Sequence, residues 1–158
     1  TVNVNYSARH LRRAGVVEEV LATLGDVELP AECLKIEITE SMLMEDVDAQ
    51  LKVLPALREA GMGVVIDDFG TGYSTLSYLL TFPADSLKID QSFVQQLALH
   101  NESYKIIETL RALTEHLDIK LVAEGIEVLA GEVAVRGRQA MPPLPFYELA
   151  TAVVVPAS

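Results

Sequence analysis

The sequence predicts an α/β fold with a parallel sheet, either a closed βα barrel or an open doubly wound sheet. Short apolar runs of strand character alternate with longer amphipathic runs of helical character. No internal repeat, linker or low-complexity stretch divides the 158 residues, a length that suits one domain with a sizeable core. Alternating strands and helices imply right-handed crossovers between parallel strands.

The first half of the chain contains two predicted strand–helix pairs. A short strand is expected over residues 2–5, and residues 7–24 read as largely helical. Residues 34–39 alternate isoleucines with polar residues and predict the second strand, and residues 46–60 carry leucines at helical spacing. Pro55 lies inside this second helix and is expected to kink or break it.

The second half continues the same alternation. Three further apolar runs predict strands, and a Gly-rich loop with a short helix follows the first of them. The strands are expected over residues 63–67, 86–90 and 120–123, and the helices over residues 74–80 and 102–116. Five strands therefore alternate with helices along the chain.

Composition excludes several classes of function. The formal net charge is −11, from 23 acidic and 12 basic side chains, which argues against binding DNA through a basic surface. A small phosphate ligand remains compatible if metal ions supply positive charge locally. Cys33 is the only cysteine, so an internal disulfide and a thiolate zinc site are excluded. No apolar run reaches the roughly 20 residues of a membrane span, and we expect a cytoplasmic domain.

Polar residues fall at the ends of successive predicted strands. In a βα barrel the carboxyl ends of all strands converge on one face, where active sites lie. An amide, several carboxylates and a lysine would meet there, an oxygen-rich set that Mg²⁺ or Mn²⁺ prefers. The residues concerned are Asn5, Glu37, Thr39, Glu40, Asp67, Asp68, Lys88, Asp90 and Glu124.

The adjacent carboxylates Asp67 and Asp68 would repel each other in a pocket. Metal ions remove that cost, so the pair predicts a two-ion site and suggests phosphodiester hydrolysis. Each site residue alone also has an ordinary explanation: Asn5 or Ser7 as a helix cap, Lys88 as a surface residue, Glu124 as a loop residue. The loop after Asp68 also reads as a plain turn.

Five segments, taken in order, resemble the motifs of the EAL family of cyclic-di-GMP phosphodiesterases. They are Asn5-Tyr6-Ser7-Ala8-Arg9, Glu37-Ile38-Thr39-Glu40, Asp67-Asp68-Phe69-Gly70-Thr71-Gly72-Tyr73-Ser74, Leu87-Lys88-Ile89-Asp90 and Ala123-Glu124-Gly125-Ile126-Glu127. The resemblance predicts an EAL domain over residues 1–128 with a partial TIM-like (βα) barrel, followed by an atypical tail over residues 129–158.

The resemblance implies hydrolysis of cyclic di-GMP to linear pGpG with two Mg²⁺ or Mn²⁺ ions. It also implies roles for individual residues. Asn5, Glu37, Asp67, Asp68 and Glu124 would be metal ligands, Lys88, Glu124 and Glu40 would be catalytic, and Asp90, Glu127, Ser7 and Arg9 would bind substrate or support the site. The Asp68–Ser74 loop would contribute to a homodimer, and regulatory or GGDEF-type domains would stand upstream in a bacterial parent protein.

Two departures from the family pattern set further expectations. Nothing before Asn5 supplies the glutamate-alanine-leucine motif, and no glutamine-glycine-aromatic motif follows Glu127. We expect a truncation or frameshift at the tail, unpaired sheet edges, poor stability or self-association, and weak catalysis. The alternative is a catalytically inactive EAL domain that binds cyclic di-GMP or a protein partner. An unrelated βα metabolic enzyme is a third class.

Overall fold

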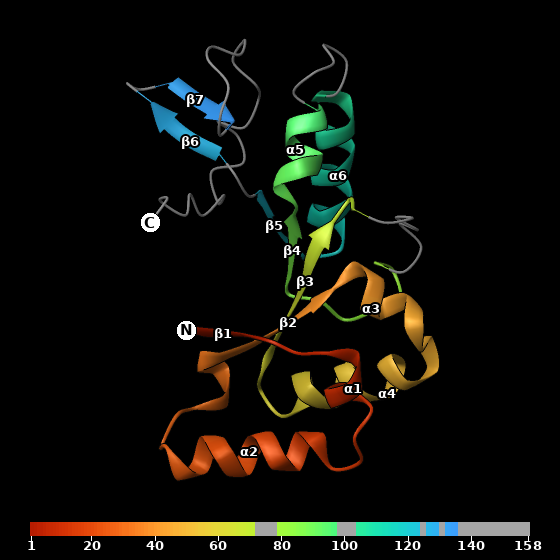
Figure 1. The fold of residues 1–158 in the computed structure, drawn as a ribbon, viewed down its shortest axis with the longest axis vertical. Helices are drawn as coiled ribbons and strands as arrows, with labels where there is room; N and C mark the ends of the chain where they lie inside the picture. Colours follow the sequence, from red (N-terminus) through yellow and green to blue (C-terminus); the bar gives the residue numbers. More distant parts are fainter. Residues whose placement is uncertain (72–78, 98–103, 124–125, 130–131, 136–158) are drawn as a thin grey trace.

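A parallel five-stranded sheet forms the centre of the molecule (Figure 1). The computed structural model describes residues 1–71, 79–97, 104–123, 126–129 and 132–135. The strands are β1 (Val2–Asn5), β2 (Leu34–Thr39), β3 (Gly63–Phe69), β4 (Ser86–Ile89) and β5 (Lys120–Ala123). All five predicted strands are confirmed, with β3 two residues longer than expected and β4 one residue shorter.

The order of the strands distinguishes between the two predicted architectures. The sheet runs β1-β2-β3-β4-β5, and every neighbouring pair is parallel. A doubly wound sheet reverses its strand order at a switch point. A consecutive order with crossovers of one hand is instead that of a βα barrel, which places the helices outside the sheet. Among the described strands, β1 and β5 are the edges.

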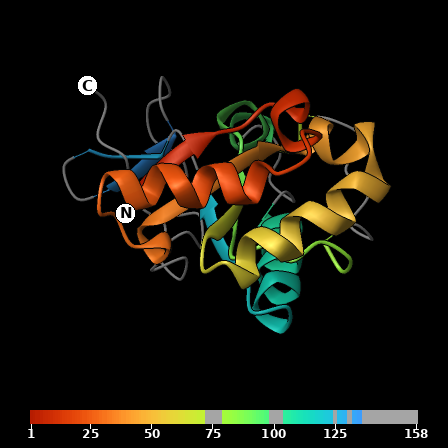
Figure 2. The ribbon, with the colours of Figure 1, turned by 90° about the horizontal axis from the view of Figure 1, so that it is seen from below.

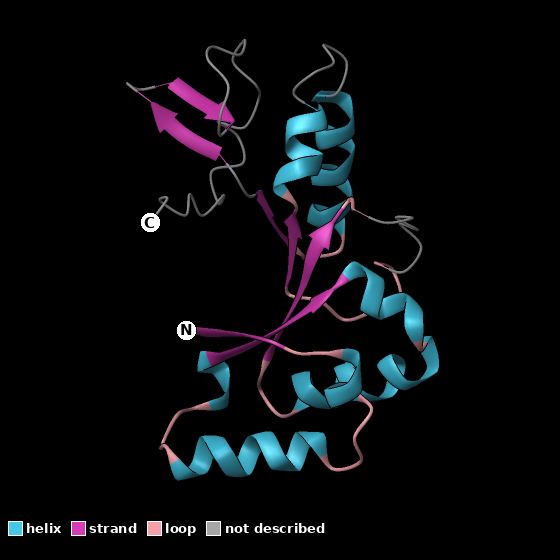
Figure 3. Cartoon of the chain, viewed as in Figure 1, coloured by secondary structure: helices cyan, strands magenta, loops and turns pink. Residues whose placement is uncertain are grey.

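Helices connect the strands and cover the sheet (Figures 2 and 3). Helix α4 contacts β3 as well as the neighbouring helices α1, α2 and α3. The helices are α1 (Ala8–Leu11), α2 (Val16–Asp26), α3 (Glu40–Glu45), α4 (Val47–Glu59), α5 (Gln91–Leu97) and α6 (Tyr104–His116), with a 3₁₀ turn at Ala31–Cys33. A small antiparallel sheet joins β6 (Ile126–Leu129) to β7 (Glu132–Val135).

Two helix predictions need correction. The helix expected over residues 7–24 is two helices, because the chain turns at Gly15, whose φ of 80° lies in the left-handed region that glycine adopts readily. The expected break at Pro55 is absent, since α4 runs unbroken from Val47 to Glu59. Leu54 and Leu57 beside the proline are fully buried, so tertiary packing holds the helix together. Of the helix expected over residues 74–80, residues 74–78 lie outside the described residues.

Alternation along the strands separates an apolar core from a polar face. Ile36, Ile38, Val64 and Ile66 are at most 1% exposed and belong to the core. Glu37 lies between the two isoleucines and therefore points to the opposite face of the sheet. The helices thus bury one face, and the other face is left for ionisable side chains.

The amino ends of the strands are held by a structural network around Asp85. Its carboxylate accepts hydrogen bonds from the Arg58 guanidinium and the Val64 N–H, both at 2.7 Å. Its backbone carbonyl accepts from the Lys120 N–H at 2.9 Å. These contacts tie α4, β3 and β5 together at the end of the sheet away from the predicted site, an end that contributes to stability in βα barrels.

Within the described segments, no helix is long and apolar enough to cross a membrane.

Candidate functional site

Strand register brings the predicted site residues to one end of the sheet. Asn5 at the end of β1 is paired with Glu37 of β2, and Thr39 is paired with Asp67 of β3. Lys88 follows on β4. Because parallel strands end at the same edge, residues far apart in sequence become neighbours there.

A lysine and two carboxylates form the centre of this site. Lys88 Nζ lies 3.0 Å from Asp67 Oδ2 and 3.6 Å from Glu37 Oε1. The side chains of Lys88, Asp67 and Glu37 are 18%, 14% and 7% exposed, so their mutual attraction is only partly screened by water. One cation therefore faces two anions in a largely buried setting.

A β-bulge places the two aspartates at the end of β3. Pairing of β3 with β4 runs regularly up to Ile66 and resumes at Phe69 with one extra residue on β3. Asp68 has a φ of 56°, and its N–H donates to Asp67 Oδ1 at 3.0 Å. Bulges of this kind redirect side chains and are frequent beside active sites.

The loop after the bulge is fixed by Glu40 and Phe93. The Gly70 N–H donates to Glu40 Oε2 at 3.0 Å, and Glu40 is only 7% exposed. A Cβ atom at Gly70 would lie 2.5 Å from Phe93 Cγ, and the φ of Gly70 is +99°. Glycine is therefore required here for both space and conformation. Residues 72–74 of this loop lie outside the described residues.

Asn3 is a site neighbour that the sequence analysis did not select. Its side-chain Nδ2 donates to Glu37 Oε1 at 2.7 Å. Asn3 precedes the predicted ligand Asn5 by two residues, and residues two apart on a strand share a face. That spacing was the available signal, but nothing in the sequence shows which of the two amides reaches Glu37.

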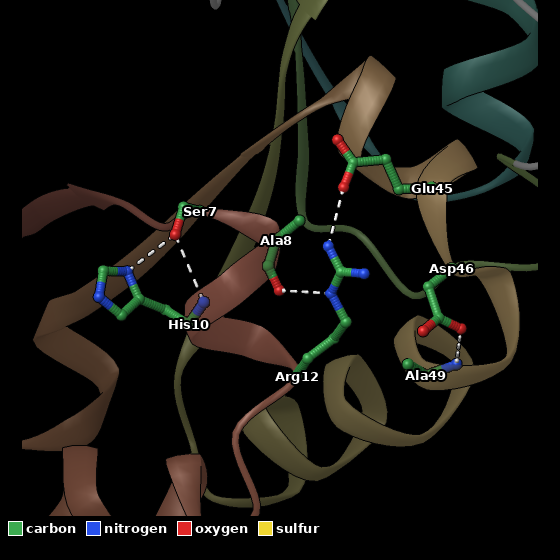
Figure 4. A network of polar contacts seen from close by, with 7 residues as sticks. All are labelled: Ser7, Ala8, His10, Arg12, Glu45, Asp46 and Ala49. Carbon is green, nitrogen blue, oxygen red and sulfur yellow. Dashed lines mark hydrogen bonds and ion pairs between the residues drawn. The ribbon is translucent and has the colours of Figure 1, made fainter.

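Several other predicted residues have local structural contacts. Asp90 Oδ1 accepts from the Ser92 N–H at 2.8 Å and from the Ser92 hydroxyl at the start of α5. Ser7 caps α1 by accepting from the His10 N–H (Figure 4). Arg9 is exposed on α1. Glu124 lies outside the described residues, and Glu127 falls in β6, where only the backbone is described.

Arg12 connects α1 to α3 (Figure 4). Its guanidinium donates to the Ala8 carbonyl at 3.3 Å and to Glu45 Oε2 at 3.0 Å. Asp46 then caps α4 by accepting from the Ala49 N–H at 3.1 Å. The two Arg12 contacts thus hold α1, which follows β1 directly, to the end of α3.

A separate groove of about 490 Å³ lies along β1 and α2. Val4, Val20 and Leu24 are among its apolar lining residues, and Tyr6 also contributes. Burial, and secondarily the negative charge of Glu19, raise the pKa of Tyr6 above its usual value. Val4 alternates with Asn3 and Asn5 along β1 and so lies on the face opposite the ion pairs, while Asn5 also lines the groove.

The side-chain types at the strand ends are those that bind a hard divalent cation. Glu37, Asp67, Asp68 and Asn5 offer carboxylate and amide oxygens, which Mg²⁺ and Mn²⁺ prefer. In the described part of the chain, no three His, Cys, Asp or Glu side chains come close enough together to hold an ion by themselves. Glu37 and Asp67 would therefore need further oxygen donors, such as Asn5 and Asp68, to hold an ion.

Fold and site together define a class of protein: an acidic βα-barrel domain with carboxylates and a lysine at the carboxyl ends of its strands. Comparison with known proteins identifies the family, because the family model for the EAL domain matches residues 1–130. The chain belongs to the EAL domain family, and its sheet is part of a TIM-like (βα) barrel of the EAL type.

Two curated relatives from Pseudomonas aeruginosa show the extent of the similarity. The chain is 42% identical over 126 residues to the cyclic di-GMP phosphodiesterase NbdA, covering 80% of this chain and 16% of that protein. It is 43% identical over 129 residues to the bifunctional diguanylate cyclase/cyclic di-GMP phosphodiesterase MucR, covering 82% and 19%. The chain thus spans less than a fifth of the length of these relatives.

Solved structures show the same similarity. The PaMucR phosphodiesterase in complex with c-di-GMP matches with a TM-score of 0.73 and 43% identity, over 83% of this chain and 53% of that chain. The Klebsiella pneumoniae BlrP1 complex with manganese and cyclic di-GMP at pH 9.0 matches with a TM-score of 0.70 and 34% identity, over 79% and 32%.

Proposed function

We propose that this chain provides much of the catalytic site of a metal-dependent phosphodiesterase that hydrolyses cyclic di-GMP to linear pGpG. The observation that supports the proposal most directly is the contact of Lys88 with Glu37 and Asp67 beside the Asp67–Asp68 bulge. Relatives that are named as cyclic di-GMP phosphodiesterases support the choice of substrate.

The proposed cation ligands are the oxygen donors at the strand ends. Asn5, Glu37, Asp67, Asp68 and Glu124 would hold two Mg²⁺ or Mn²⁺ ions. Bound ions would supply positive charge for the phosphate and lower the pKa of water. The manganese and cyclic di-GMP of the BlrP1 complex support this assignment.

The chain's own polar groups would position the reactants. Lys88 would donate a hydrogen bond from Nζ to the attacking water and orient that water toward phosphorus. In its neutral form, Lys88 would instead accept a proton from the water. Glu40 would keep the loop after Asp68 in place through the Gly70 N–H. Asp90 and Ser7 would contribute through the helices that they cap, and Arg9 and Glu127 would contact the nucleotide.

Further parts of the proposal concern the surroundings of the domain. The EAL domain would extend over residues 1–128, with residues 129–158 as an atypical tail. The Asp68–Ser74 loop would contact a second copy, and GGDEF-type or other regulatory domains would belong to the parent protein, as the bifunctional relative MucR suggests. The setting would be the bacterial cytoplasm.

A second function has one observation in its favour. Lys88 forms ion pairs with both Glu37 and Asp67. A domain that kept this ion-pair network during ligand binding would bind cyclic di-GMP, or a protein partner, without hydrolysis.

Loss of cyclic di-GMP on addition of Mn²⁺ tests the proposal. We expect turnover by the wild-type chain and at least a 100-fold loss in Asp67→Asn, because the change removes a charged oxygen donor from the centre of the site. Asp48→Asn is the matched control, since Asp48 is exposed on α4 and is not among the proposed ligands. Binding of cyclic di-GMP without turnover would select the second function. Equal turnover in both variants would contradict the assignment of Asp67.

A further inference from the structure

Asn3 contacts the proposed metal ligand Glu37 from the edge strand. In the register of β1 and β2, Asn3 is paired with Lys35 and Asn5 with Glu37. Asn3 thus lies two residues closer to the amino end of β1 than the partner of Glu37, and its side chain reaches diagonally across to Glu37 Oε1, to which Nδ2 donates at 2.7 Å. Asn3 and Asn5 share a face of β1, so both amides belong to the same side of the sheet.

The contact is of a kind that fixes a carboxylate. A neutral amide that donates to an ionised oxygen forms a charge-assisted bond, which is shorter and stronger than a neutral one. The same Oε1 atom faces Lys88 Nζ at 3.6 Å. Oε1 therefore accepts a hydrogen bond from β1 and faces a cation on β4, and turning the carboxylate away would weaken both contacts.

We propose that Asn3 is a positioning residue that holds Glu37 Oε1 so that the carboxylate presents Oε2 to a divalent cation. The proposal rests on the function proposed above, in which Glu37 is a metal ligand. Residues that hydrogen-bond a ligand without touching the metal fix its orientation, and their removal typically weakens metal binding about 10–100-fold.

A purely structural role for Asn3 predicts a different result. Asparagine is disfavoured in strands, and β-branched threonine is favoured there. Asn3→Thr should therefore preserve or improve β1 as a strand, while its hydroxyl is too short to reach Glu37. If Asn3 only supports the strand, the variant binds Mn²⁺ as tightly as the wild type; if Asn3 positions Glu37, the variant loses metal affinity.

Mn²⁺ titration of the full chain, followed by the electron paramagnetic resonance signal of free Mn²⁺, separates these roles. We expect the Kd for Mn²⁺ to rise about tenfold in Asn3→Thr and to stay within about threefold in Asn3→Gln, which keeps an amide donor. Val2→Thr is the control on the opposite face of the same strand. An unchanged Kd in Asn3→Thr overturns the proposal, and so does an equal rise in Val2→Thr.

Two measurements on variants of Glu37 show whether a negative result counts against the role of Asn3 or against the proposed function. If Glu37→Gln binds Mn²⁺ as tightly as the wild type, Glu37 is not a ligand and the proposed function is at fault. A double-mutant cycle of Asn3→Thr and Glu37→Ala, measured by urea unfolding without metal, should show about tenfold coupling in the unfolding constant. Coupling with an unchanged Kd in Asn3→Thr would show that the contact exists but does not position the ligand.

Discussion

Replacing Lys88 with methionine should destabilise the metal-free protein strongly. Methionine keeps an unbranched chain of similar length but removes the charge, so Glu37 and Asp67 lose the cation that lies 3.6 Å and 3.0 Å from them. Two carboxylates would then remain in a setting where one is 7% and the other 14% exposed. Uncompensated buried charge is among the few causes of large mutational effects.

The magnitude follows from the charges and their burial. With an effective dielectric constant of about 20, each contact of Lys88 has a gross attraction of about 5 kcal/mol. Loss of hydration of the three groups offsets much of this energy. Removing one partner of a buried ion pair costs about 3–5 kcal/mol. Because Lys88 is 18% exposed, we expect the lower end, about 3 kcal/mol in the free energy of unfolding.

Urea unfolding followed by circular dichroism, with and without Mn²⁺, measures the effect. Mn²⁺ should recover stability more in Lys88→Met than in the wild type, because the ion no longer competes with the ammonium group. Binding at about 100 times the Kd adds about 2.7 kcal/mol. Lys120→Met is the control: this exposed residue begins β5 at the other end of the sheet, and we expect a change within about 0.5 kcal/mol.

Two results would refute this reasoning. Lys88→Met could lose no more stability than Lys120→Met, in which case the ion pairs contribute nothing measurable. Alternatively, Mn²⁺ could stabilise Lys88→Met no more than the wild type. The ion and the ammonium group would then not compete for the same carboxylates.

Two further predictions concern packing. Gly70→Ala should cost about 3 kcal/mol in urea unfolding, because the new Cβ would lie 2.5 Å from Phe93 Cγ and the positive φ alone costs about 1–2 kcal/mol. Phe93→Leu in the same chain should recover the steric part only, and an unchanged stability in Gly70→Ala would contradict the clash. Gln50→Leu should raise the free energy of unfolding by about 1–2 kcal/mol, because Gln50 is 1% exposed and neither amide atom has a partner in the described part of the chain. A loss of stability in Gln50→Leu would show that the amide has a partner.

The strands were predictable because their signal is local. Apolar side chains that recur within five or six residues mark β2 and β3 without knowledge of their neighbours. The break before Gly15 was not predictable in this way, because apolar residues at helical spacing continue through it. The break that Pro55 favours is absent for the opposite reason: the buried Leu54 and Leu57 outweigh the lost hydrogen bond, and their burial depends on the whole fold.

The site was predictable in its composition but not in its contacts. Placement at strand ends identified Glu37, Asp67 and Lys88 as neighbours, and the structure brings these three together. The bulge at Asp68 depends on how β3 pairs with β4, and therefore leaves no trace in the sequence. The same limit applies to Asn3, whose contact requires the register of β1 against β2.

The position of β1 at the edge of the sheet has a consequence for dynamics. All four residues of this strand are exposed, and it pairs with β2 alone in the described sheet. Such a strand belongs to the part of a protein that opens locally at the lowest free energy, so its amides should exchange with solvent before those of β3. Asn3 and Asn5 both lie on β1, so the proposed cation site would form only in the fraction of molecules in which β1 is paired with β2. The apparent affinity for a cation would fall in proportion to that fraction.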